Sequence, residues 1–108
     1  MSDTRDEKII KIIKQAGADF LERESNGASL ITVTDIKLSN DGKYATILFT
    51  VFPEDKQDAA LEFAKRMRSE FKEYVKKNTK LGRIPLFDFE IDLGEKHRQR
   101  IDEISLKN

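Results

Sequence analysis

The chain has 108 residues and a formal net charge of zero, because 20 lysines and arginines balance 20 aspartates and glutamates. This length predicts a single domain, residues 1–108 with a core over about 5–106, that can bury a hydrophobic core. The absence of cysteine and the presence of one histidine exclude disulfides and zinc–thiolate sites, and we expect neither a cofactor nor a metal. No apolar run is long enough for a membrane span or a secretory signal, so we expect a cytoplasmic protein.

The first element is predicted to be a helix over residues 5 to about 24. Ile9, Ile13, Ala16 and Phe20 recur at helical spacing and form an apolar stripe. Gly27 is well suited to the left-handed conformation that follows a helix end.

Residues 30–38 and 44–52 are predicted to be two strands of an antiparallel hairpin. The first strand is rich in β-branched residues. From Ile31 onward, its apolar residues fall on odd positions up to Val33 and on even positions from Ile36, and a bulge near Thr34 and Asp35 would return them to one face. Residues 39–43 form a strong turn signal that contains Gly42.

A second long helix is predicted after Pro53. Ala60, Ala64, Met67, Phe71, Tyr74 and Val75 recur at helical spacing. Because residues 59–75 contain no helix breaker and many helix formers, we expect this helix to run unbroken through at least Tyr74.

The third strand is predicted between Pro85 and Asp92, where apolar and acidic residues alternate strictly. Phe87, Phe89 and Ile91 would face the core. Ile101 and Ile104 then suggest a short C-terminal helix. Helices covering one face of a three-stranded sheet make an α+β domain, in which we expect Ile9, Ile13, Phe20, Phe49, Phe71, Phe87 and Phe89 to pack together.

The second long helix carries most of the segregated charge. Residues 62–83 contain eight bases and three acids, so this segment has a formal net charge of +5. On a continuous helix Lys65, Arg68, Lys72, Lys76 and Lys80 occupy one arc of roughly 120°. Such a stripe is typical of a polyanion site, but equally of the solvated face of an amphipathic helix. The candidate residues for contact with a polyanion are Lys65, Arg66, Arg68, Lys72, Lys76, Lys77, Lys80 and Arg83.

The candidates for catalysis are weaker. Asp88, Glu90 and Asp92 line one face of a strand, which favours a solvent-exposed surface over a carboxylate pair in a cleft. His97 lies among charged residues, where surface packing or packing at the edge of the core is the simpler interpretation. We therefore expect no catalytic residues.

Several short motifs together resemble the ribosome-binding factor A family of bacterial small-subunit assembly factors. Arg83-Ile84-Pro85, the strand that ends at Asp92, and Arg100-Ile101-Asp102-Glu103-Ile104 are similar to the family's pattern in order and spacing. The hairpin and Arg68-Ser69 are similar as well. The family bends its middle helices at an Ala-x-Gly motif, whereas this chain has Phe63-Ala64-Lys65 without the glycine.

The resemblance implies a type II KH-like domain of the order helix, strand, strand, helix, helix, strand. It also implies a non-catalytic, monomeric factor that binds small-subunit ribosomal RNA on the immature small ribosomal subunit and assists its maturation, away from any membrane. The residues alone leave two alternatives open. One is a protein-interaction module that sets its charged helix face against an acidic partner; the other is an acid–base enzyme that uses Asp88, Glu90 or His97.

Overall fold

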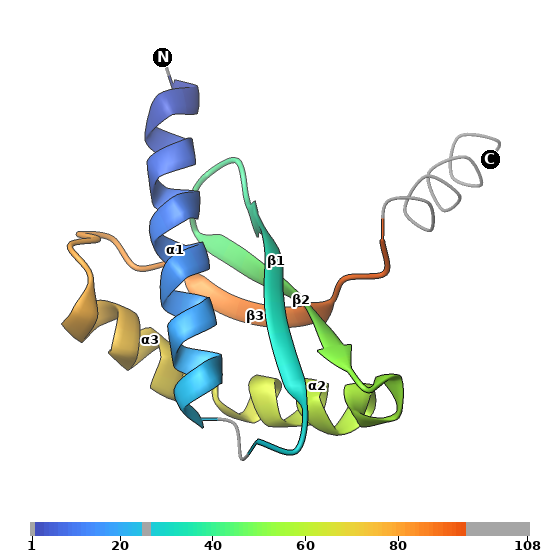
Figure 1. Cartoon of the computed structure of the whole chain (residues 1–108). Coiled ribbons are helices and arrows are strands. Elements are labelled where there is room, and N and C mark those ends of the chain that lie inside the picture. Colours follow the sequence, from blue (N-terminus) through green and yellow to red (C-terminus); the bar gives the residue numbers. More distant parts are fainter. Residues whose placement is uncertain (1, 25–26, 95–108) are drawn as a thin grey trace, which may run out of the picture.

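The structure is a computed structural model that describes residues 2–24 and 27–94 (Figure 1). Its elements are α1 (Ser2–Glu24), β1 (Leu30–Leu38), β2 (Tyr44–Phe52), the 3₁₀ helix η1 (Glu54–Lys56), α2 (Gln57–Arg66), α3 (Arg68–Asn78) and β3 (Leu86–Ile91). This order confirms the predicted α+β class and the helix and strand sequence of the KH-like arrangement. The short helix predicted around Ile101 and Ile104 lies outside the described residues.

The strands form one sheet in the order β1-β2-β3. β1 and β2 are the predicted antiparallel hairpin, and β3 pairs with β2 in parallel. The predicted bulge is confirmed, because the register of the hairpin shifts between Val33 and Asp35. The extra residue places Val33 and Ile36 on the same face of the sheet, which explains the change of phase in the sequence.

The turn between β1 and β2 is also confirmed. Gly42 has a φ of 73°, a left-handed conformation in which a side chain would be strained. The carboxylate of Asp41 accepts hydrogen bonds from the amide of Lys43 and the hydroxyl of Ser39. These two bonds, with that of Lys43 the stronger influence, hold the pKa of Asp41 below its ordinary value.

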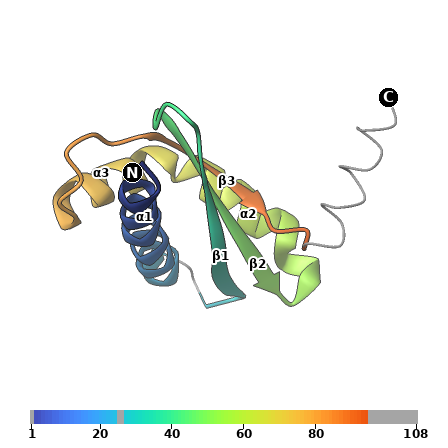
Figure 2. The ribbon, with the colours of Figure 1, turned by 90° about the horizontal axis from the view of Figure 1, so that it is seen from above.

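All three long helices pack on one face of the sheet, where aromatic rings form the centre of the core. Phe71 of α3 meets Phe87 and Phe89 of β3, with ring centroids 4.7 and 5.5 Å apart. Phe20 of α1 packs against Phe71 and Tyr74 of α3, and Figures 1 and 2 both show α1 beside α3. The predicted core is confirmed: Ile13, Phe20, Phe49, Phe71, Phe87 and Phe89 are buried, and Ile9 packs at its margin.

The opposite face of the sheet has no described helix over it. Leu30, Tyr44, Phe52 and Leu86 point to this open face and are more than half exposed. Leu48 alternates onto the same face, yet only 3% of its surface is exposed. Beside it the hydroxyl of Thr34 donates to the Asp92 carboxylate and to the Leu48 carbonyl, which links β1 to the end of β3 across β2.

The prediction of an unbroken helix through Tyr74 is wrong. α2 ends at Arg66 and α3 begins at Arg68, and Met67 between them has φ −93° and ψ 9°. The amide of Met67 donates to the carbonyls of Phe63 and Ala64. The Lys65 carbonyl accepts a hydrogen bond at 2.9 Å from Nε of Arg68, so that a side chain satisfies an acceptor at the break.

Tertiary packing explains the bend. A straight helix over residues 57–78 would be about 33 Å long, whereas three strands span only about 10 Å from edge to edge. α2 lies against β2 and β3, while α3 turns to lie against both β3 and α1. The turn keeps Phe71 and Val75 fully buried. Local preference for a continuous helix is thus overridden at Met67, beside the stretch that corresponds to the family's Ala-x-Gly motif.

Candidate nucleic-acid interface

The bend between α2 and α3 brings two of the predicted cations onto one carboxylate. Nζ of Lys65 lies 3.0 Å and a guanidinium nitrogen of Arg68 lies 3.4 Å from Oδ1 of Asp88. The three side chains are 39%, 50% and 38% exposed, respectively. Ion pairs at this exposure contribute about 0–1 kcal/mol each to stability. Both cations therefore remain accessible to a second anion.

Asp88 is held at the bend because it lies on the edge strand. The amides of Leu86 and Asp92 donate to carbonyls of Lys43 and Phe49, so the intervening Phe89 amide points to the free edge of β3. Oδ1 of Asp88 accepts a hydrogen bond from this amide at 2.8 Å. The carboxylate thereby covers part of an edge that would otherwise be open to pairing.

Opposing influences act on the pKa of the Asp88 carboxyl. Partial burial raises the pKa of its carboxyl. The hydrogen bonds from Lys65 and the Phe89 amide, and the positive charges of Lys65 and Arg68, together outweigh burial and leave the pKa below its ordinary value. Asp88 is therefore ionised at neutral pH and occupies the place where an external anion would bind these two cations.

A groove beside the bend extends this positive region. Arg68, Ser69 and Lys72 from α3 line it together with Tyr44, Leu86 and other residues at the start of β2 and β3. Tyr44, which is 56% exposed, lines the same groove as Arg68 and Lys72. Sequence reasoning did not single out Tyr44, although its place in the alternation of β2 already put it on the face opposite Ala45.

The remaining predicted cations do not share this groove. Arg66 lines a separate groove between α2 and the start of β1, and Lys80 lies beside α1. Lys76 follows Lys72 by one turn of α3, and Arg83 is exposed in the loop before β3. The predicted cations therefore lie at several separate places around α2 and α3.

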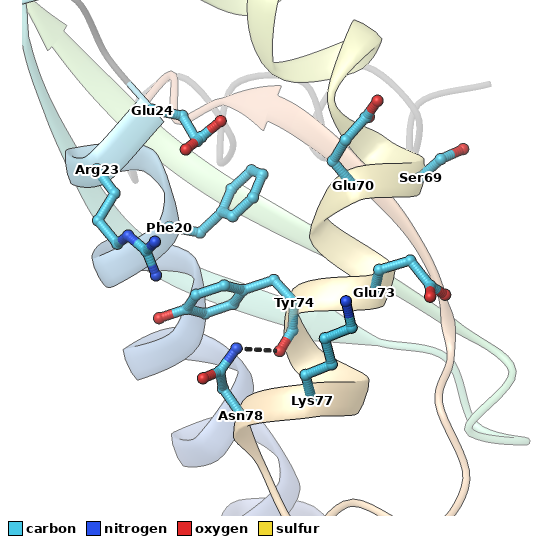
Figure 3. A pocket seen from close by; sticks show the side chains of 9 residues that line it. All are labelled: Phe20, Arg23, Glu24, Ser69, Glu70, Glu73, Tyr74, Lys77 and Asn78. Atoms are coloured by element: carbon cyan, nitrogen blue, oxygen red, sulfur yellow. Dashed lines mark hydrogen bonds between the residues drawn. The ribbon is translucent and has the colours of Figure 1, made fainter.

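A third groove, between the end of α1 and α3, shows why position matters more than the count of bases (Figure 3). Lys77 and Arg23 share it with three glutamates, so its formal charge is negative. The guanidinium of Arg23 lies 5.6 Å from the centre of the Tyr74 ring, over which it is placed. This groove does not suit a phosphate chain, and Lys77 is consequently a poor candidate for RNA contact.

Within residues 2–24 and 27–94, no group of three or more His, Asp or Glu side chains could hold a metal ion. Asp88 forms ion pairs with Lys65 and Arg68, and His97 lies outside the described residues. None of the described helices is long and apolar enough to cross a membrane.

Comparison with known proteins decides the family. The family model for ribosome-binding factor A matches residues 5–105 of the chain. The chain belongs to the ribosome-binding factor A family. It is 36% identical over 110 residues to ribosome-binding factor A of Thermobifida fusca, an alignment that covers 95% of this chain and 70% of that protein. The family member of Kosmotoga olearia is 29% identical over 98 residues, an alignment that covers 90% of this chain and 78% of that protein.

Solved structures of the family share the fold. The crystal structure of ribosome-binding factor A from Thermus thermophilus matches with a TM-score of 0.69 at 21% identity, covering 78% of this chain and 91% of that one. The solution structure of a Thermotoga maritima protein, a putative ribosome binding factor A, matches with a TM-score of 0.57 at 21% identity. The match covers 86% of this chain and 89% of that one. A homology model of T. thermophilus ribosome-binding factor A, fitted into a cryo-EM map of its complex with the 30S subunit, matches with a TM-score of 0.64 at 22% identity. The match covers 73% of this chain and 86% of that one.

Proposed function

We propose that this chain binds ribosomal RNA of the immature small ribosomal subunit and assists its maturation without catalysing a reaction. Membership of the ribosome-binding factor A family supports this function. So does the T. thermophilus homology model, which was fitted into a map of a 30S complex. The observation that carries the proposal is the cluster of Lys65, Arg68 and Lys72 at the bend, next to the exposed ring of Tyr44.

The geometry suggests how such an interface would work. Asp88 already holds Lys65 and Arg68 in place, so a phosphate that exchanges for the carboxylate meets cations whose ordering cost has been partly met. Phosphate contacts fix position but do not read bases. The ring of Tyr44 offers a surface on which an unpaired base can stack. Recognition would then depend mainly on RNA shape, with one stacked base beside the bend.

A matched pair of charge variants tests the interface. Lys72→Gln with Lys76→Gln removes one charge from the groove beside the bend and one from the next turn of α3, and Lys11→Gln with Lys14→Gln removes two from α1. Both variants lose the same net charge, and all four side chains lie off the buried faces. If both α3 lysines contact phosphates, the slope of log affinity against log salt should flatten by about 1.4–1.8 in the first variant only.

The measurement is binding to small-subunit ribosomal RNA over a series of salt concentrations, with folding checked by circular dichroism. Equal losses in the two variants would show that only overall charge matters. Normal binding by the α3 variant together with lost binding by the α1 variant would place the RNA site on α1. Either result would remove the assigned interface at the bend.

A further inference from the structure

The open face of the sheet presents an apolar patch at one end. Leu30 and Phe52 are direct cross-strand partners in the hairpin, and they are 66% and 72% exposed. By contrast, Val51, the neighbour of Phe52 on the covered face, is only 6% exposed. An adjacent leucine and phenylalanine that together remain this exposed typically mark a surface that another segment or molecule covers.

The chain leaves the sheet at this same end. β3 runs parallel to β2, so Asp92 follows the register pair Ile91 and Phe49, and its amide donates to the Phe49 carbonyl. Its side chain accepts a hydrogen bond from Thr34 of β1 on the open face. Leu93, the next residue, is 57% exposed. The described part of the chain therefore ends beside the patch.

The sequence of residues 95–108 has the composition that this surface requires. Ile101 and Ile104 are three residues apart, a spacing that places both on one side of a helix. Fourteen helical residues would extend about 21 Å, within the roughly 30 Å length of the nine-residue strand β2. The segment is thus long enough to cover the end of the face near Phe52 but too short to reach Tyr44 at the other end.

Acidic side chains on the open face have basic counterparts in the first part of the segment. Asp35 and Glu90 are exposed carboxylates that alternate onto the open face on either side of Leu48. The bases nearest Gly94 are Lys96, Arg98 and Arg100, and over residues 95–108 four bases against three acids give a net charge of +1. The same carboxylates would repel the phosphates of a nucleic acid, which makes RNA a poor occupant of this face.

From these observations we infer that residues 95–108 dock on the open face of the sheet, with Ile101 and Ile104 against Leu30 and Phe52. The docked segment would complete a second, smaller apolar cluster on the side of the sheet opposite the main core. This arrangement leaves Tyr44 and the bend between α2 and α3 uncovered. The docking is therefore compatible with the RNA interface but independent of it.

A spin label on the full-length chain tests the docking directly. The chain has no cysteine, so Gln99→Cys provides a single attachment site, on the side of a helix opposite Ile101. We expect the label to broaden the amide resonances of Leu30 and Phe52 but not those of Lys14 or Lys76. Adding Ile101→Ser and Ile104→Ser to the labelled chain should abolish the effect. Absence of broadening at the two strand residues would overturn the inference.

A mixing experiment separates the segment from a second copy. Labelled chains without ¹⁵N are mixed with unlabelled ¹⁵N chains, and broadening of Phe52 in the mixture would show that another molecule covers the face and would overturn the inference. A double-mutant cycle adds an independent measurement. Phe52→Ala and Ile101→Ala should have non-additive effects on stability, whereas Leu86→Ala and Ile101→Ala should be additive. Additivity in both cycles would also contradict the docking.

Discussion

The two faces of the sheet use the same strands and residues of the same types, but they differ in what surrounds each side chain. Phe89 on the covered face is fully buried and packs against the ring of Phe71. Phe52 on the open face is 72% exposed. The contribution of a phenylalanine to stability thus depends on its position in the strand alternation and on what packs above it.

The open face also contains an exception that sharpens this contrast. Leu48 lies among threonines and carboxylates rather than under a helix, yet its exposed fraction of 3% equals that of a core residue. Neighbouring strands and the link between Thr34 and Asp92 surround it. Burial in this sheet therefore follows local surroundings and not simply the presence of a helical layer.

The largest expected effect is at the centre of the covered face. Phe89→Ala should lower the free energy of unfolding by about 3–5 kcal/mol, because it removes a fully buried ring and leaves a cavity. Leu86→Ala on the same strand is the control, and its 55% exposed side chain predicts a change within about 0.5 kcal/mol. Urea titration followed by circular dichroism measures both. Similar losses in the two variants would contradict the assignment of the two faces.

Leu48→Ala should have an intermediate effect of about 2 kcal/mol, at the lower end for a buried leucine, since polar neighbours surround it. Thr50→Ala, on the same strand and face but exposed, should change stability by about 0.5 kcal/mol or less. The same urea titration compares the two variants. If Leu48→Ala costs no more than Thr50→Ala, the pocket around Leu48 contributes nothing to stability.

The division into two faces could be predicted from the sequence, because alternation in a strand is a local property. The acids between Phe87 and Ile91 identified the outer side of β3, and the change of phase in β1 identified the bulge at Thr34. The aromatic core followed once the strands and the two helical stripes were placed. These features depend on period and turn chemistry, which neighbouring residues determine.

The bend at Met67 could not be predicted in the same way. No residue nearby disfavours a helix, and the cause is the position of α1 and β3, which only the folded chain brings together. The candidate site depends on that bend, since it places Lys65 at the end of α2 and Arg68 at the start of α3 around one carboxylate. The arc of cations assumed a continuous helix, and that helix is broken at Met67.

The smallest expected effect is at the free edge of β3, where Asp88 joins the strand to the bend. Because its folded-state pKa is lowered, the unfolded chain binds a proton at this position more readily than the folded chain. The stabilisation is therefore complete at pH values above the ordinary aspartate pKa of about 3.9 and is lost as the pH falls through the folded-state value. Its size should be at most about 1 kcal/mol, since the carboxylate is 38% exposed.

Asp88→Asn tests this effect without removing the acceptor for the Phe89 amide, since the asparagine side chain keeps a carbonyl oxygen. At neutral pH the variant should be slightly less stable than the parent chain, and the two unfolding midpoints should converge as the solution is acidified below about pH 4. Glu90→Gln, exposed on the same strand, controls for the loss of one negative charge. A gap between Asp88→Asn and the parent chain that stays constant down to low pH would show that the Asp88 carboxylate is not what ties the edge of β3 to Lys65 and Arg68.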